Sequence, residues 1–237
     1  WIIAAVANNG IGGSGVAPNA KILPIQVLNE NGSGNAGTVA SGVDFAVQQG
    51  AKVINLSLGG EAEDTTLSKA IKNATDNGAL VIAAAGNGGD LDKPKWPAAL
   101  DLTIAVTAVD PANKATPFNQ RGDYIDIAAP GTNILSTARG IYRSNKCLSD
   151  EPRLCFESGT SMAAGFVAGA AALLFAAEPR VTNAQVRDIL LRTATDIGDP
   201  GRDATFGAGL INMVAALAEL QRIYPPIAAP QISAVGH

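Results

Sequence analysis

Short apolar runs of strand length alternate along this chain with longer helical patterns. Such alternation is typical of βαβ units, in which helices cover both faces of a parallel sheet. Strands are expected at 21–28, 52–58, 80–85, 103–109 and 124–128, and helices at 38–49, 65–77, 161–177, 182–193 and 213–221. With 237 residues, 47% of them hydrophobic, the chain can bury a sizeable single core. The sequence therefore predicts one α/β domain.

Composition narrows the expected partners and the domain boundaries. The formal net charge is −4 and no run of Lys or Arg could follow a phosphate backbone, so nucleic acid is not an expected partner. Glycine, asparagine or charged residues interrupt the apolar stretches short of a membrane span, so a membrane is not expected either. The domain is predicted at 1–221 and a Pro-rich tail at 222–237. The start at Trp1 indicates a processed, truncated or engineered product.

A Gly-Thr-Ser turn at 159–161 leads directly into the apolar run 164–175. Glycine permits a sharp backbone turn, which places Ser161 in the first turn of the following helix. The dipole and the free N–H groups of a helix N-terminus favour negative charge beside it. This pattern predicts an activated serine nucleophile.

The segments around this turn resemble those of the subtilisin-like serine proteases, the subtilases. The matching segments are 15–20, 55–60, 83–87, 129–131, 159–163 and 207–212, and the resemblance runs from residue 1 to about 220. It implies a three-layer α/β subtilisin-like fold with a mostly parallel sheet between helices, truncated at its N-terminus. It also implies a secreted serine endopeptidase that requires no cofactor.

Only one member of the family's catalytic triad has a match in this chain. The triad follows the order Asp, His, Ser, and the family's histidine helix runs into the segment matched here by 2–9, so the chain begins just beyond that histidine. The only histidine of the sequence is His237. A peptidase would need the His and Asp of a companion N-terminal chain. An esterase-like hydrolase could instead use water, a nearby Lys or Asp, or His237 folded back or donated by a neighbour in a homo-oligomer.

Asn87 is the second catalytic candidate. The matching family residue donates a hydrogen bond to the oxyanion of the tetrahedral intermediate. The alternative is an asparagine that satisfies its own backbone in a turn. Thr160 is expected to assist catalysis or, alternatively, to cap the helix.

The resemblance implies that a peptide substrate adds as an extra strand beside two chain segments. The segments that match those flanking the substrate are Gly32-Ser33-Gly34 and Ser57-Leu58-Gly59, while Gly59, Gly60, Ala84 and Gly86 would leave room for the side chain before the scissile bond. Ordinary turn chemistry is the alternative explanation for these glycines.

Lys95 falls near the expected floor of that side-chain pocket, just before a Trp96-Pro97 bond that matches a cis-proline of the family. A preference for acidic groups is one interpretation of Lys95, and a solvated surface lysine is the other. Past the nucleophile, the family's Pro-His pair is replaced by Gly165-Phe166, which is expected to open space around the serine.

Cys147 and Cys155 bracket a polar loop just before the nucleophile turn. A disulfide is the favoured interpretation, because two cysteines make a poor metal site and a short closed loop suits a secreted hydrolase. Two reduced cysteines in a cytosolic loop are the alternative.

Two segments resemble cation sites of the family. Residues 7–13 match a calcium loop, and Asp126 matches a second, weaker site. Bare structural loops are the alternative for both, and no metal ligands are assigned.

The missing N-terminal part would carry a strand between those matched by 21–28 and 52–58. Unpaired buried backbone groups are costly, so either a second polypeptide fills the gap or the two flanking strands close up into a five-stranded sheet. The newly exposed apolar surface would favour oligomers.

Three functions follow. The first is a subtilase-type hydrolase that cleaves peptide bonds, the second is an esterase-like hydrolase that uses Ser161 without the usual triad, and the third is an inactive peptide-binding or assembly module.

Overall fold

The computed structural model describes residues 1–10, 12–89, 93–137, 147–148 and 153–225. The helices are α1 (Ala36–Gln48), α2 (Thr65–Asp76), α3 (Thr160–Ala177), α4 (Asn183–Arg192) and α5 (Met213–Ile223). The strands are β1 (Val53–Leu56), β2 (Leu80–Ala84), β3 (Thr103–Val109), β4 (Ile127–Pro130), β5 (Ile134–Thr137) and β6 (Leu154–Glu157).

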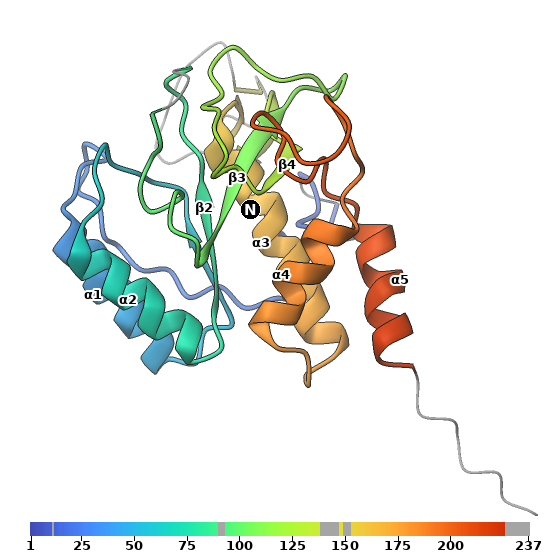
Figure 1. Cartoon of the computed structure of the whole chain (residues 1–237), viewed down its shortest axis with the longest axis horizontal. Coiled ribbons are helices and arrows are strands. Elements are labelled where there is room, and N and C mark those ends of the chain that lie inside the picture. Colours follow the sequence, from blue (N-terminus) through green and yellow to red (C-terminus); the bar gives the residue numbers. More distant parts are fainter. Residues whose placement is uncertain (11, 90–92, 138–146, 149–152, 226–237) are drawn as a thin grey trace, which may run out of the picture.

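Strands β1 to β4 form a parallel sheet in the order β1-β2-β3-β4, and helices cover both of its faces (Figure 1). Every residue of β2 and β3 is buried. Along β2, Leu80, Ile82 and Ala84 pack toward α3, α4 and α5, whereas Val81 and Ala83 pack toward α1 and α2. This two-residue alternation between two apolar layers confirms the predicted three-layer α/β fold.

Polar caps fix where several helices begin. The Asn35 side chain accepts a hydrogen bond from the Thr38 N–H at the start of α1, and Asp64 accepts from two N–H groups at the start of α2. Thr182 and Gln185 form a reciprocal capping box at the start of α4. Each cap satisfies backbone donors that the helix itself leaves unpaired.

Helix α3 crosses the centre of the molecule. It has the length and apolar composition of a membrane span, but 56% of that window is buried inside the protein. Two glycines let other segments approach it: a Cβ on Gly165 would lie 3.2 Å from Ile2 Cγ2, and one on Gly169 would lie 2.6 Å from Val16 Cβ. Gly165 was expected to open space near the nucleophile. Instead, the side chain of Ile2 fills that space.

The predicted strand at 21–28 is wrong, and the alternative in which the flanking strands close up into a five-stranded sheet is not adopted, because the described parallel sheet has four strands. The segment has no ladder partner within the described residues, and only one edge of β1 is paired there. Val27 packs on α1 instead, where a Cβ on Gly42 would lie 2.5 Å from Val27 Cγ1. Because the segment is attached to the helix, it does not close up against β1.

An apolar groove of about 1030 Å³ separates the 21–28 segment from β1. Its lining includes Ile22, Ile25, Val27, Ile54, Asn55 and Phe175. The flanking segments therefore leave the predicted gap open, and the unpaired edge of β1 borders it.

Other boundaries differ from the prediction. Strand β4 begins at Ile127 rather than at 124, and the antiparallel pair β5–β6 was not predicted. Helix α5 continues to Ile223, beyond the predicted domain end at 221. Just after this helix, the Tyr224 hydroxyl donates a hydrogen bond to Gln185 Oε1 of α4 at 2.8 Å, so Tyr224 also belongs to the domain. The division at 221–222 thus falls inside a helix, and the tail at 226–237, with His237, lies outside the described residues.

A disulfide joins Cys147 to Cys155 in β6. This confirms the predicted cross-link and excludes the alternative of two reduced cysteines in this structure. It closes a loop just before the turn that leads into α3.

Candidate active site

The candidate nucleophile lies where the carboxyl ends of β1 and β2 meet the start of α3. Ser57 follows β1, Gly86 and Asn87 follow β2, and Ser161 occupies the first turn of α3. In open parallel sheets this edge is where ligands bind, because loops and helix N-termini gather there.

Backbone contacts hold the nucleophile turn. The Gly159 N–H donates to the Gly131 carbonyl at 2.8 Å, and the Met162 N–H donates to the Gly159 carbonyl at 3.1 Å. A Cβ on Gly159 would lie 3.2 Å from Asn87 Nδ2, so glycine at this position permits a close approach by the Asn87 carboxamide.

Asn87 is oriented by Thr160. Its Oδ1 accepts hydrogen bonds from the Thr160 N–H at 2.9 Å and from the Thr160 hydroxyl at 3.0 Å. Thr160 Oγ1 in turn accepts from the Gly86 N–H at 3.1 Å. With Oδ1 committed to Thr160, the donor Nδ2 lies on the side of Gly159. The helix cap position belongs to Gly159, so the alternative of Thr160 as the cap is wrong.

Ser161 contacts the chain that follows β1. Its Oγ donates to the Ser57 carbonyl at 3.4 Å, a long bond, and the Ser57 hydroxyl donates to the Ser161 carbonyl at 3.0 Å. A peptide carbonyl cannot take the serine proton as a base. His237 lies outside the described residues, so this structure does not place it against Ser161.

Asn55 extends this network and was missed by sequence reasoning. Its Nδ2 donates to the Ser57 hydroxyl at 2.9 Å, while its Oδ1 is buried and accepts no hydrogen bond from the described part of the chain. Asn55 also lines the groove beside β1. Its place within the Asn-Leu-Ser run could have drawn attention to it, because an asparagine in an otherwise apolar strand needs polar partners.

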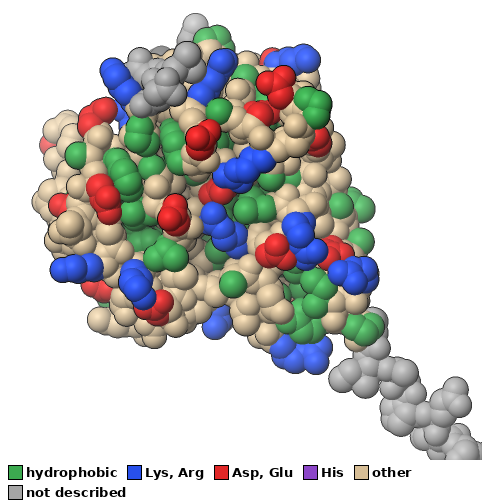
Figure 2. Space-filling model, viewed as in Figure 1, with side chains coloured by type: hydrophobic (Ala, Val, Ile, Leu, Met, Phe, Trp, Pro, Cys, Tyr) green, Lys and Arg blue, Asp and Glu red, His purple; other side chains and the backbone are tan. Residues whose placement is uncertain are grey.

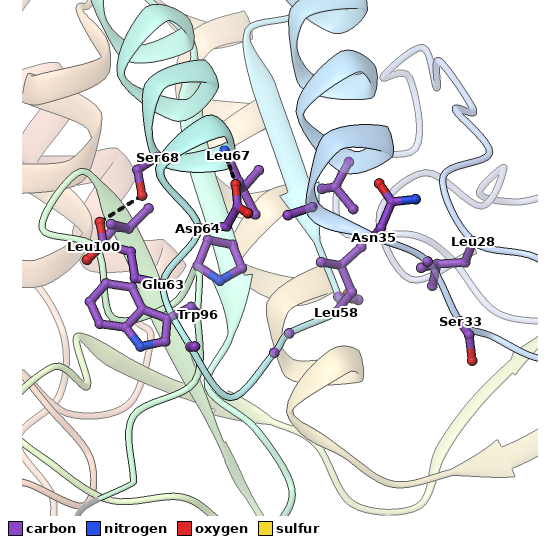
Figure 3. A pocket seen from close by; sticks show the side chains of 18 of the residues that line it. Leu28, Ser33, Asn35, Leu58, Glu63, Asp64, Leu67, Ser68, Trp96 and Leu100 are labelled. Carbon is purple, nitrogen blue, oxygen red and sulfur yellow. Dashed lines mark hydrogen bonds between the residues drawn. The ribbon is translucent and has the colours of Figure 1, made fainter.

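The two predicted substrate segments face one cavity of about 450 Å³ (Figure 3). Seven of the predicted substrate residues line it: Gly32, Ser33, Gly34, Ser57, Leu58, Gly59 and Gly60. Leu28, Val39, Leu67, Trp96 and Leu100 give it an apolar wall. Near its rim, the Ser68 hydroxyl donates to Glu63 Oε1 at 2.8 Å, and Asp64 is committed to capping α2 (Figure 3).

The remaining predicted substrate residues, Ala84, Gly86 and Lys95, do not line this cavity. Ala84 is buried in β2, and the room expected over Gly86 is occupied, since a Cβ there would lie 2.6 Å from Lys95 Cγ and 2.8 Å from Gln120 Cγ. Lys95 pairs with Glu61, and its side chain is only 16% exposed. It is therefore not a solvated surface lysine.

The loop that carries Lys95 is firmly held. The Trp96-Pro97 bond is cis, as the resemblance implied, and Trp96 and Gly60 exchange backbone hydrogen bonds of 2.8 and 3.0 Å. Nearby, the Tyr124 hydroxyl donates to the Ala85 carbonyl at 3.1 Å, and burial raises the pKa of Tyr124 to about 12.

Asp126 is not a cation site. Its carboxylate accepts hydrogen bonds from Arg187 Nη2, from Arg202 Nη2 and from the Ala105 N–H, each at 3.0–3.1 Å. Two guanidinium groups already neutralise it, which supports the structural-loop alternative over the weak cation site at Asp126. Within the described residues, no group of three His, Cys, Asp or Glu side chains could hold a metal.

A half-buried serine at a helix N-terminus, beside an oriented carboxamide and at the carboxyl edge of a parallel sheet, defines a serine hydrolase of the α/β type. The sequence model described as "Subtilase family" matches residues 2–209. The chain belongs to the subtilase family.

The chain is similar to several proteases. It is 41% identical to Subtilisin DY of Bacillus licheniformis, and the match covers 90% of this chain and 73% of that protein. It is 40% identical to an alkaline protease of Alkalihalobacillus alcalophilus, covering 90% of this chain and 52% of the relative. Among solved structures, a psychrophilic subtilisin-like protease from Pseudoalteromonas sp. AS-11 superimposes with a TM-score of 0.81 at 25% identity, covering 93% of this chain and 82% of that one. These comparisons confirm the predicted class, a serine endopeptidase of the subtilase type.

Proposed function

We propose that this chain provides the nucleophile and the oxyanion-stabilising half of a peptide-cleaving site. Ser161 is the nucleophile, Asn87 donates to the oxyanion, and Thr160 positions Asn87. One observation carries the assignment. Both recorded hydrogen bonds to Asn87 Oδ1 come from Thr160, which leaves Nδ2 as the donor on the side of the nucleophile turn.

In the proposed reaction, Ser161 Oγ attacks the carbonyl carbon of the substrate and its proton passes to a base. The carbonyl oxygen becomes negatively charged, and Asn87 Nδ2 and the N-terminus of α3 stabilise it. Collapse of the tetrahedral intermediate releases the amine, which takes the proton from the same base, and water then releases the acyl group.

The base comes from a companion segment that carries the Asp and His of the triad. The groove beside β1 supports this proposal, because it reaches Asn55 and Ser57, which are linked to Ser161 by hydrogen bonds. The matched subtilisin and alkaline protease are longer than this chain, which spans 73% and 52% of their lengths. A homo-oligomer that donates His237 is the competing source.

The substrate is an extended peptide that runs between 32–34 and 57–59. The apolar wall of the 450 Å³ cavity favours a hydrophobic side chain some residues before the scissile bond. The disulfide supports a secreted location, since such bonds persist in oxidising compartments. Calcium at 7–13 stays a prediction, and the comparisons with proteases favour neither the esterase nor the inactive binding module.

The test is the rate at which a fluorophosphonate labels the chain, followed by intact mass. We expect one adduct that is lost in Ser161→Ala. In Asn87→Asp, which keeps an oxygen for Thr160 but removes the Nδ2 donor, labelling should slow by about 10²–10³-fold, the cost of one lost oxyanion donor.

A synthetic companion segment that carries the subtilase Asp and His should accelerate the same labelling. An adduct that persists in Ser161→Ala, or equal rates for Asn87→Asp and the wild type, would contradict the proposed roles.

A further inference from the structure

Lys95 lies behind both chain segments that contact the nucleophile turn. Its side-chain stem packs against Gly86, whose N–H donates to Thr160, and its Cβ would lie 3.7 Å from a Cβ on Gly59. Ser57, two residues before Gly59, exchanges hydrogen bonds with Ser161. The stem of Lys95 therefore packs against both segments, and its ammonium pairs with Glu61, which directly follows Gly60.

Glu61, the charge partner of Lys95, is much more exposed to solvent than Lys95. The Glu61 carboxylate that pairs with Lys95 has a side chain that is 78% exposed, whereas the Lys95 side chain is 16% exposed. Ion pairs with one exposed partner contribute little, because water competes for the carboxylate. The lysine, in contrast, is held by packing and by the Trp96–Gly60 backbone pair next to it.

We propose that Lys95 selects a substrate with an acidic side chain next to the scissile bond, with Glu61 as a displaceable stand-in for that carboxylate. The inference rests on the proposed function, since it concerns the same cleft. An incoming glutamate or aspartate would replace Glu61 and keep the largely buried ammonium paired. An uncharged side chain that displaced Glu61 would leave the ammonium unpaired, and a basic one would be repelled.

An apolar side chain can still bind if Glu61 stays paired with the Lys95 ammonium, but Glu61 then occupies space that the side chain would otherwise use. The selectivity therefore depends on competition between two carboxylates, one fixed to the chain and one brought by the peptide. Removing the first should sharpen the preference for the second.

The test measures peptide binding, which requires no activated serine. Fluorescein-labelled peptide amides that differ only in their last residue, Glu, Gln or Lys, are titrated with the full chain and followed by anisotropy. We expect the Glu peptide to bind roughly two- to fivefold more tightly than the Gln peptide, the range that a partly exposed charge pair gives.

The variants separate the two carboxylates. Glu61→Gln should widen the ratio between the Glu and Gln peptides, and Lys95→Met, which keeps the aliphatic stem, should abolish it. Lys114→Met removes the same charge at an exposed position outside the Lys95–Glu61 ion pair, and it should leave the ratio unchanged.

Equal binding of the Glu and Gln peptides in both the wild type and Glu61→Gln would overturn the proposal, and so would absence of binding by all three peptides. Fluorophosphonate labelling of Ser161 reports separately on the proposed catalytic function. A chain that is labelled but shows no charge preference would refute only the role of Lys95.

Discussion

Replacing Asp126 by asparagine tests a buried charge cluster, in contrast to the acidic and basic side chains that are interspersed over the face of the molecule drawn in Figure 2. The Asp126 side chain is 6% exposed and joins Arg187 of α4 and Arg202 to the Ala105 N–H of β3. Arg187 also donates to the Thr103 carbonyl at 2.7 Å, and Arg202 to the Ile125 carbonyl at 2.7 Å. The cluster thus ties α4 and the 201–203 loop to the sheet.

Breaking a buried ion pair by removing one partner costs about 3–5 kcal/mol. Here the arginine side chains are 27% and 47% exposed, so water recovers part of their solvation, and we expect Asp126→Asn to lower the free energy of unfolding by about 2–3 kcal/mol. For a domain of this size that corresponds to a fall in melting temperature of about 4–12 °C.

The assay is urea unfolding followed by circular dichroism at neutral pH, with Asp101→Asn as the control. Asp101 is exposed, so its replacement should change stability by less than about 0.5 kcal/mol. If Asp126→Asn were no less stable than Asp101→Asn, the cluster would contribute nothing and the reasoning would fail. An unchanged dependence of the free energy of unfolding on urea concentration would show that both variants expose the same surface on unfolding, so that their stabilities can be compared.

Three further predictions concern other parts of the fold. Because burial raises the folded pKa of Tyr124 to about 12, the stability that its neutral hydroxyl contributes is complete below pH 10 and is lost as the pH rises from 10 to 12; Tyr124 is only partly buried, so the wild type should lose about 1–2 kcal/mol more than Tyr124→Phe in urea unfolding over that range. Gly169→Ala should lower the free energy of unfolding by about 1–3 kcal/mol, because the added methyl group would clash with Val16. Adding Val16→Ala should restore part of the lost melting temperature, and a double variant with no such recovery would contradict the close packing of Val16 on Gly169. Reducing the Cys147–Cys155 bond should lower stability by about 2–3 kcal/mol, as expected for a short closed loop, and an unchanged melting temperature after reduction would argue against a structural role.

The parts of the fold that sequence predicted well are those with redundant apolar signals. Strands β2 and β3 are fully buried and read as continuous apolar runs, so they were placed almost to the residue. The 21–28 segment carries the same signal but is not a strand, because a ladder needs a partner and its side chains pack on α1 instead. An apolar run therefore predicts that a segment is buried, whereas strand formation also requires a neighbouring strand with which it can form hydrogen bonds.

The hairpin β5–β6 escaped prediction for the opposite reason. Its strands have four residues each, and β5 has no fully buried residue, so neither gives a clear period-two pattern. Their pairing is long-range along the chain, and a short sequence window cannot detect it.

For the candidate site, the sequence motifs predicted which residues of the nucleophile turn come together, but they did not predict the ion pair between Lys95 and Glu61. Ser161, Thr160 and Asn87 converge, as their place in the nucleophile turn and after β2 indicated. Glu61 was overlooked, since nothing in the sequence shows that a glutamate in a loop meets Lys95, which is 34 residues away. Such pairs appear only once the cis Trp96-Pro97 turn and Gly60 are seen to be joined.

The central position of α3 ties the nucleophile to the most slowly opening part of the molecule. Amide hydrogens in a helix packed between a sheet and two other helices exchange mainly through global unfolding, whereas the amide of an exposed residue such as Glu61, which lies outside the Gly60–Trp96 backbone pair, exchanges through local opening at small free-energy cost. The buried body of α3 therefore moves only with the whole core, and the side of the cleft that adapts locally is the exposed segment that carries Glu61. Hydrogen exchange should consequently divide the cleft into one wall that moves and one that does not.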